Sequence, residues 1–288
     1  MKPRHIGDCL DEAARRLLDA GIVGARKEAR LLMGYWLNRD PAQLFGPQYE
    51  EVGAPESFFD LVDRRVGREP LSHLVGRREF WSLEFEVSDS VLDPRPDSEV
   101  LIETGLLHWP NRSDSFSVLD LGTGSGCLLL SLLRNRPRAI GVGVDVSGAA
   151  LEIARRNAAR IVPDGRAQFL KADWGSSISQ PFDLVVANPP YIPSDQISEL
   201  DAEVKNFEPL LALDGGLDGL DAYRAIAEDL VRLTTPTGLI LLEIGSGQSE
   251  QVASILEKSG LVVKCIKNDL AGRNRCLVAH HYVDRSVK

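Results

Sequence analysis

The hydrophobic pattern changes twice along the chain. From Asp8 to about Arg68, apolar residues recur at the spacing of amphipathic helices, interrupted by glycine and proline. Residues 79–92 then alternate apolar and polar positions and are rich in aromatic side chains, which predicts a β-hairpin or extended linker. After Ser115, short apolar runs alternate with longer helical patterns. We therefore expect a small helical bundle, a linker and a larger α/β part.

The alternation of short apolar runs and helical patterns after Ser115 predicts a doubly wound, mostly parallel sheet. Its helices are expected to begin near Ser125, Ser147, Leu220 and Gln248. The last two strands are joined only by residues 268–274, which are too few for a crossover helix, so this pair is predicted to be antiparallel. The apolar runs place strands at 118–121, 140–144, 167–170, 182–187, 239–244, 261–267 and 275–281.

Composition and charge narrow the class of protein. The 288 residues suffice for two domains, and no apolar run approaches the roughly 20 residues of a transmembrane helix. Residues 1–8 lack the apolar core of a signal peptide, so we expect a cytoplasmic protein.

The four cysteines show neither CxxC pairs nor metal-ligand spacing, so no disulfide framework or metal site is expected. A net charge of -9 weakly opposes a nucleic-acid substrate.

A glycine-rich segment follows the first strand of the α/β part. At such a strand-to-helix turn a ligand can approach the backbone, and the helix presents its N–H groups. The dinucleotide fingerprint requires glycine where this chain has Cys127, so NAD is disfavoured. The residues predicted to bind a different cofactor here are Gly122, Thr123, Gly124, Ser125 and Gly126.

Acidic residues follow the next two predicted strands. Asp145 ends the second strand, where a carboxylate can bind a ribose diol, although capping of the next helix is an alternative. Asp173 and Trp174 follow the third strand and could receive an adenine through a carboxylate and an apolar ring. A surface aspartate beside a packed tryptophan fits these two residues equally well. All three are predicted cofactor-binding residues.

Asn188-Pro189-Pro190-Tyr191 stands where the fourth strand ends. Each proline restricts the residue before it to extended backbone, and neither ring has an N–H to donate. What remains is a rigid row of hydrogen-bond acceptors beside an aromatic ring, which would suit a substrate with an NH2 group. A diproline turn with a core tyrosine is the alternative.

In this order, the glycine loop, Asp145, Asp173 and the Asn-Pro-Pro-Tyr segment resemble the S-adenosylmethionine-dependent methyltransferases of the Rossmann-like class. The resemblance implies S-adenosylmethionine as cofactor and a mostly parallel seven-stranded sheet whose last strand is antiparallel. Within this class, Asn-Pro-Pro-Tyr is typical of enzymes that methylate planar nitrogens, either the exocyclic amines of bases or the glutamine side-chain amide.

Motifs outside this core resemble the protein-glutamine N5-methyltransferases that modify peptide chain release factors. The chain departs from that family's commoner residues at Asp93, Ser98 and Asn274, and none of these departures removes a residue of the proposed chemistry. The matching motifs are Glu69–Gly76, Glu79–Trp81, Pro94–Glu99, Phe207–Pro209, Ala212–Gly216, Asp218–Leu220, and Asp269–Arg273 with Arg275.

The resemblance implies a helical substrate-recognition domain over residues 1–75, a β-hairpin linker over 76–95 and a methyltransferase domain over 96–288. It implies class I release factors as partners, methylated in their Gly-Gly-Gln loop, with no direct nucleic-acid or membrane partner. The helices could instead form a stabilising cap. Three other functions stay open: methylation of a ribosomal-protein glutamine, methylation of adenine or guanine, and cofactor binding without catalysis.

The predicted chemistry activates an amide nitrogen, a poor nucleophile. The Asn188 side-chain oxygen and the Pro189 carbonyl would accept its two N–H bonds, favouring pyramidalisation and stabilising the transition state, while Tyr191 packs against the amide. Asn188, Pro189 and Tyr191 are thus the predicted catalytic residues, and Asn188 also borders the cofactor. The predicted substrate-binding residues are these three with Pro190 and Glu208, although the Phe207–Pro209 segment could be structural. Arg95 and Glu99 are placed near the pocket wall.

Overall fold

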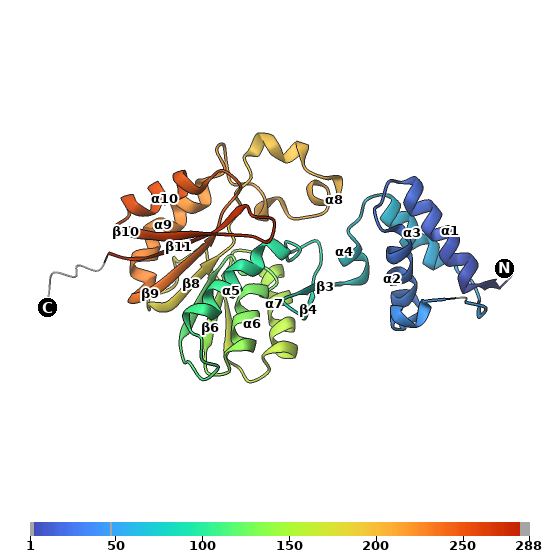
Figure 1. The fold of residues 1–288 in the computed structure, drawn as a ribbon, viewed down its shortest axis with the longest axis horizontal. Helices are drawn as coiled ribbons and strands as arrows, with labels where there is room; N and C mark the ends of the chain where they lie inside the picture. Colours follow the sequence, from blue (N-terminus) through green and yellow to red (C-terminus); the bar gives the residue numbers. More distant parts are fainter. Residues whose placement is uncertain (1–2, 47, 283–288) are drawn as a thin grey trace. The chain divides into compact units, whose positions relative to one another are not determined.

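A computed structural model describes residues 3–46 and 48–282. The chain divides into two compact units, Met1–Arg77 with Asp201–Phe207, and Arg78–Leu200 with Glu208–Lys288 (Figure 1). The first unit therefore includes a short segment from far along the chain. Within the described residues, no helix is both long and apolar enough to cross a membrane.

The first unit is built on helices whose apolar stripes share one core. Its helices are α1 (Ile6–Asp19), α2 (Ala25–Leu37), α3 (Glu56–Val66) and the short α4 (Leu71–Val75), with a 3-10 turn at Pro41–Leu44. Leu17, Leu32 and Phe58 are fully buried where α1, α2 and α3 meet. The helical prediction for this region is confirmed.

Two features of the first unit were not predicted. Strands β1 (Arg4–His5) and β2 (Glu51–Val52) form an antiparallel pair, and two residues are too few to produce a recognisable alternation. The segment containing α8 (Ala202–Lys205) is held by ion pairs, in which the buried Arg65 donates to Glu203 at 2.9 Å and to Glu28 at 2.6 Å.

The predicted hairpin is formed by β3 (Arg77–Phe80) and β4 (Leu83–Glu86). Trp81 and Ser82 connect the strands with φ values of 51° and 58°, as a two-residue hairpin turn with positive φ at both positions requires. The buried side chains of Phe80 and Phe85 pack into the core of the second unit.

The second unit contains a seven-stranded sheet in the order β10-β11-β9-β8-β5-β6-β7. Strands β5 to β9 are mutually parallel where they pair, and β11 is antiparallel to both β9 and β10. This arrangement confirms the predicted fold class and the antiparallel last strand. The strands are β5 (Ser117–Leu121), β6 (Ile140–Asp145), β7 (Ala167–Lys171), β8 (Phe182–Ala187), β9 (Thr234–Glu243), β10 (Leu261–Asn268) and β11 (Asn274–His281).

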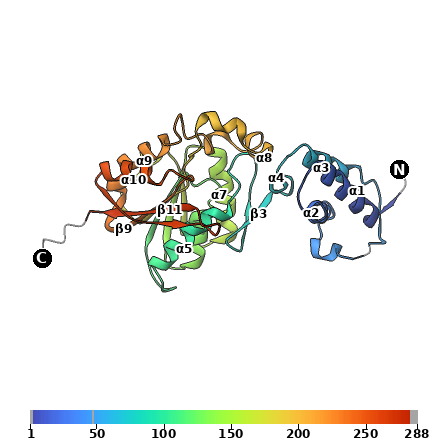
Figure 2. The same cartoon turned by 45° about the horizontal axis from the view of Figure 1, so that its top comes forward.

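Helices cover both faces of this sheet (Figures 1 and 2). Helices α5 (Glu99–His108), α6 (Cys127–Asn135) and α7 (Gly148–Ile161) pack on one face, and α9 (Asp221–Leu233) and α10 (Ser249–Lys258) on the other. Successive residues of the central strands alternate between the two cores, because side chains in a strand point to opposite faces.

The order of the strands reverses beside β5, which pairs with β6 on one side and with β8 on the other. In doubly wound sheets, ligands bind at the carboxyl ends of the strands flanking such a reversal. Residues 188–200 and 208–220, between β8 and α9, lie at this end and contain two 3-10 turns, Ser194–Glu199 and Leu210–Ala212, where the sequence predicted only a loop.

Candidate active site

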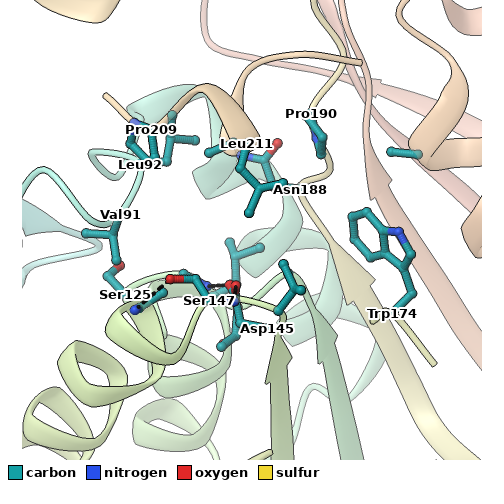
Figure 3. Close-up of a pocket in the computed structure, with 18 of the residues that line it drawn as sticks. Val91, Leu92, Ser125, Asp145, Ser147, Trp174, Asn188, Pro190, Pro209 and Leu211 are labelled. Atoms are coloured by element: carbon teal, nitrogen blue, oxygen red, sulfur yellow. Dashed lines mark hydrogen bonds between the residues drawn. The ribbon is translucent and has the colours of Figure 1, made fainter. Parts of the chain in front are cut away.

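A cavity of about 420 Å³ opens at the carboxyl ends of β5, β6 and β8 (Figure 3). Asp145 and Ser125 lie on one side of it, and Asn188 and Pro190 on the opposite side. Among the predicted cofactor-binding and substrate-binding residues, those that line it are Gly122, Thr123, Gly124, Ser125, Asp145, Asp173, Trp174, Asn188 and Pro190. Gly126, Pro189, Tyr191 and Glu208 do not.

The first side, which we call the glycine-loop wall, comprises Gly122–Ser125 and Asp145. The backbone N–H groups of Gly122 and Thr123 both donate to the Val144 carbonyl, at 3.0 and 2.8 Å, which holds the loop against β6. Gly122 has a φ of 73°, a conformation that favours glycine, and a Cβ there would come within 3.3 Å of the Trp174 ring. The loop, which leads into the N-terminal end of α6, thus passes close to the Trp174 ring.

The Thr123 hydroxyl donates to Asp120 at 2.6 Å, below the loop. Asp120 is fully buried in β5, and burial raises the pKa of its carboxyl to about 7. Through this hydrogen bond, the buried Asp120 side chain stabilises the position of Thr123 in the loop.

Asp145 is fixed by two backbone donors. Its carboxylate accepts the Gly124 N–H at 2.9 Å and the Ser147 N–H at 2.8 Å. Ser147, not Asp145, caps α7, because the Ser147 hydroxyl accepts the Ala150 N–H. The capping alternative for Asp145 therefore fails, and its half-buried carboxylate is presented to the cavity in a rigid orientation.

The Trp174 ring borders the cavity beyond Asp145 (Figure 3). It is partly buried and packs against the core on the α9 face, while Asp173 is exposed. Trp174 has a φ of 46°, which is uncommon for a residue with a bulky side chain and places it next to Gly122. The ring offers an apolar surface and Asp173 a nearby acceptor.

The opposite side, which we call the Asn188 wall, comprises Ser98, Asn188 and Pro190, with Glu243 behind them. The Asn188 Nδ2 donates to the Ser98 hydroxyl at 3.2 Å, and that hydroxyl donates to the Glu243 carboxyl at 2.5 Å. Within the described residues, the Asn188 side-chain oxygen accepts no hydrogen bond. This wall therefore offers a free carbonyl oxygen.

Glu243 ends β9 and is almost completely buried. Burial raises the pKa of its carboxyl to about 7, opposed by the Ser98 hydroxyl and the positive charge of Arg275. The Tyr191 hydroxyl donates to it at 3.4 Å and accepts from Arg275 at 3.4 Å, and Arg275 in turn pairs with Asp97 at 3.2 Å. The titratable and charged groups around Glu243, which are Tyr191, Arg275 and Asp97, thus come from three separate segments of the chain.

Tyr191 and Pro189 are adjacent to Pro190 in the chain but are not among the residues that line the cavity. Burial raises the pKa of Tyr191 above its ordinary value, and its ring packs against the core on the α9 face. Gln248 donates to the Tyr191 carbonyl at 2.9 Å, which fixes the turn after β8. Pro189 is buried.

Glu208 is held by an ion pair. Arg95, which lines the cavity, donates to both of its carboxyl oxygens, at 2.5 and 2.7 Å. Burial raises the pKa of Glu208 to about 7, opposed by Arg95. Glu99 accepts the Trp81 N–H at 2.9 Å and does not line the cavity, so it belongs to the hairpin contact.

Ser98 and Glu243 were absent from the predicted site residues. Glu243 carries the signal that identified Asp145, an ionisable residue at the end of an apolar strand, which could have marked it. Ser98 carries no comparable signal, because its role depends on contacts 90 and 145 positions along the chain.

The features of the cavity suit S-adenosylmethionine. A cofactor that presents a diol and a planar base needs a fixed carboxylate and an aromatic surface, and Asp145 and Trp174 provide both. Within the described residues, no group of three or more His, Cys, Asp or Glu side chains could hold a metal ion.

Residues 94–205 match the family model of the methyltransferase small domain, and residues 8–76 match that of the PrmC N-terminal domain. A ribosomal protein L11 methylase from Lactobacillus delbrueckii subsp. bulgaricus has a similar fold, with a TM-score of 0.50, 17% identity, and coverage of 68% of this chain and 83% of that one. The fold and the site thus define an S-adenosylmethionine-dependent methyltransferase of the Rossmann-like class, which confirms the predicted cofactor.

Two curated relatives extend over nearly the whole chain. The release factor glutamine methyltransferase of Rhodospirillum rubrum is 44% identical over 95% of this chain and 84% of its own length. That of Caulobacter vibrioides is 41% identical over 92% of this chain and 93% of its own. The chain belongs to the release factor glutamine methyltransferase family.

Proposed function

We propose that this protein transfers a methyl group from S-adenosylmethionine to the side-chain amide nitrogen, N5, of the glutamine in the Gly-Gly-Gln motif of class I peptide chain release factors, supporting translation termination. The observation that carries the chemistry is the free Asn188 side-chain oxygen in the wall opposite the glycine loop. Membership in the family supports the choice of substrate.

When bound, S-adenosylmethionine would supply an electrophilic methyl group on a sulfonium sulfur, whose bond to the methyl carbon breaks as the new carbon–nitrogen bond forms. The methylated nitrogen then releases one of its two protons to water. The protein's task lies with the nitrogen, whose lone pair is delocalised into the amide carbonyl. The Asn188 Oδ1 accepts one N–H of the substrate amide and the Pro189 carbonyl accepts the other. Both acceptors gain strength as positive charge develops on the nitrogen, so they act mainly in the transition state.

The glycine-loop wall holds the cofactor. Asp145 binds the ribose hydroxyls, since its carboxylate is already oriented by two backbone donors and keeps unused acceptor positions. Asp173 and Trp174 receive the adenine, and Gly122 to Ser125 accommodate the remainder next to the backbone. Fixing both reactants in this way makes the transfer effectively unimolecular.

The remaining walls receive the substrate. Pro190 and Tyr191 shape the slot for the planar amide and exclude water. Glu208, tied to Arg95, supports the segment that carries Pro209 and Leu211 to the cavity edge. The helical part, residues 1–75, recognises the body of the release factor, residues 76–95 form the linker, and residues 96–288 carry out the transfer.

Incubation with methyl-labelled S-adenosylmethionine tests the substrate directly. Purified class I release factors, ribosomal proteins and nucleic acids are offered separately, and the labelled residue is mapped by mass spectrometry. We expect label on the Gly-Gly-Gln glutamine alone. A release factor whose Gly-Gly-Gln glutamine is replaced by alanine is the matched control, and label on a ribosomal protein or a base would overturn the proposal.

A further inference from the structure

Glu243, which the proposed reaction does not use, is buried directly behind the proposed catalytic asparagine. We infer that Ser98 and Glu243 are positioning residues that orient the Asn188 amide group so that its oxygen, and not its nitrogen, faces the methyl acceptor. This inference rests on the proposed function.

The orientation follows from counting protons. A serine hydroxyl has one proton to donate, and the Glu243 carboxyl, once it is ionised above its pKa of about 7, can only accept. The Ser98 proton is directed to Glu243 at 2.5 Å, so the Ser98 oxygen can only accept from its other neighbour. That neighbour is the Asn188 amide, which must therefore turn its NH2 group to Ser98, at 3.2 Å.

The alternative orientation would defeat the chemistry. An asparagine side chain rotated by half a turn has nearly the same shape, so packing alone selects poorly between the two. With its NH2 group facing the cavity, Asn188 would offer donors to a substrate NH2 group that is itself a donor. The proposed hydrogen bond in the transition state would be lost.

The surroundings keep this chain of hydrogen bonds rigid. Ser98 and Glu243 are 2% and 1% exposed, so water does not compete freely for their groups. Ser98 lies in the 3-10 turn Pro96–Ser98 that leads into α5. The Tyr223 hydroxyl donates to the backbone carbonyl of Glu243 at 2.8 Å, which fixes the end of β9.

Three single variants test this inference in steady-state methylation of a release factor. Ser98→Ala removes the hydroxyl, and we expect kcat to fall roughly 10- to 100-fold, as small misplacements at a reacting centre do. The KM for the release factor and the calorimetric affinity for S-adenosylmethionine should change by less than about 3-fold. Ser98→Thr keeps the hydroxyl and should restore kcat to within about 3-fold of wild type. Ser131→Ala, which removes another buried hydroxyl in the same unit, should leave kcat unchanged.

A double variant separates positioning from general structural damage. If Ser98 acts through Asn188, adding Ser98→Ala to Asn188→Ala should lower kcat by less than about 2-fold further, because coupled residues are not additive. The same loss in both backgrounds, or full activity of Ser98→Ala alone, overturns the inference. Wild-type inactivity toward the release factor is a different result, since it overturns the proposed function and this inference with it.

Discussion

The two walls of the cavity are built from differently spaced parts of the chain. The glycine-loop wall comes from two consecutive strand ends, and its central contact joins Gly124 to Asp145 across 21 positions. The Asn188 wall joins Ser98, Asn188 and Glu243 across 90 and 145 positions. The first wall is organised mainly by backbone donors, and the second by side chains that determine one another's orientation.

This difference indicates where each wall is vulnerable. Backbone donors remain when a side chain is replaced, so a substitution in the glycine-loop wall should weaken binding in proportion to the contact removed. In the Asn188 wall each side chain depends on the next, so one substitution should disturb groups that it does not touch. The predictions below test that contrast.

The largest effect is expected for Asn188→Ala. Turnover should fall roughly 10²- to 10³-fold, the typical loss when one preorganised hydrogen-bonding group is removed from an active site. Cofactor affinity, measured by calorimetry, should be retained. Near-normal turnover in this variant would show that the Asn188 oxygen has no role in the reaction.

Asp145→Ala should produce the opposite pattern. A hydrogen bond to a charged group contributes about 1.5–3 kcal/mol, so the Kd for S-adenosylmethionine should rise roughly 10- to 100-fold, while kcat at saturating cofactor changes little. Asp145→Asn is the matched control, because it keeps one acceptor for the backbone N–H groups and should lose less. Unchanged affinity of Asp145→Ala would exclude ribose binding by this residue.

Behind each wall lies a buried acid, Asp120 or Glu243, whose raised pKa should make stability depend on pH. Asp120 and Glu243 both have a pKa of about 7 in the folded protein, above their unfolded values. The unfolded chain releases these protons first, so the free energy of unfolding should fall as pH rises from about 4 to 7, by on the order of 1–3 kcal/mol per group.

Denaturant unfolding at several pH values measures this effect. Asp120→Asn and Glu243→Gln should each flatten the decline over that pH window. If neither variant alters the slope of the free energy of unfolding against pH, then neither carboxyl has a raised pKa in the folded protein. Glu243→Gln should also lower kcat, because a glutamine can present its NH2 group to Ser98 and reverse the hydrogen bond, whereas Asp120→Asn should not act on Asn188.

The smallest effect is expected for Tyr191→Phe. Its hydroxyl makes only long contacts, at 3.4 Å to both Glu243 and Arg275, so removing it should lower kcat by roughly 2- to 5-fold. Tyr191→Leu, which also removes the aromatic ring, should lower kcat further than Tyr191→Phe if the ring packs against the substrate amide. Equal rates for the two variants would count against that packing.

Much of the fold follows from local sequence patterns. The predicted strands at 118–121 and 182–187 match β5 and β8 within one residue, because a buried parallel strand is a continuous apolar run bounded by turn residues. The short strands β1 and β2 and the 3-10 turns before α9 were missed, since so few residues carry no measurable period.

The sequence by itself determined the doubly wound sheet, the glycine loop, the position of Asp145 and the location of Asn188 at a strand end, because each depends on residues close together in the chain. Only the tertiary structure decided that Ser98 and Glu243 stand behind Asn188, that Arg95 holds Glu208, and that the segment 201–207 joins the helical unit. These contacts link distant segments, and a single side chain gives no local sign of the partner that folding brings to it.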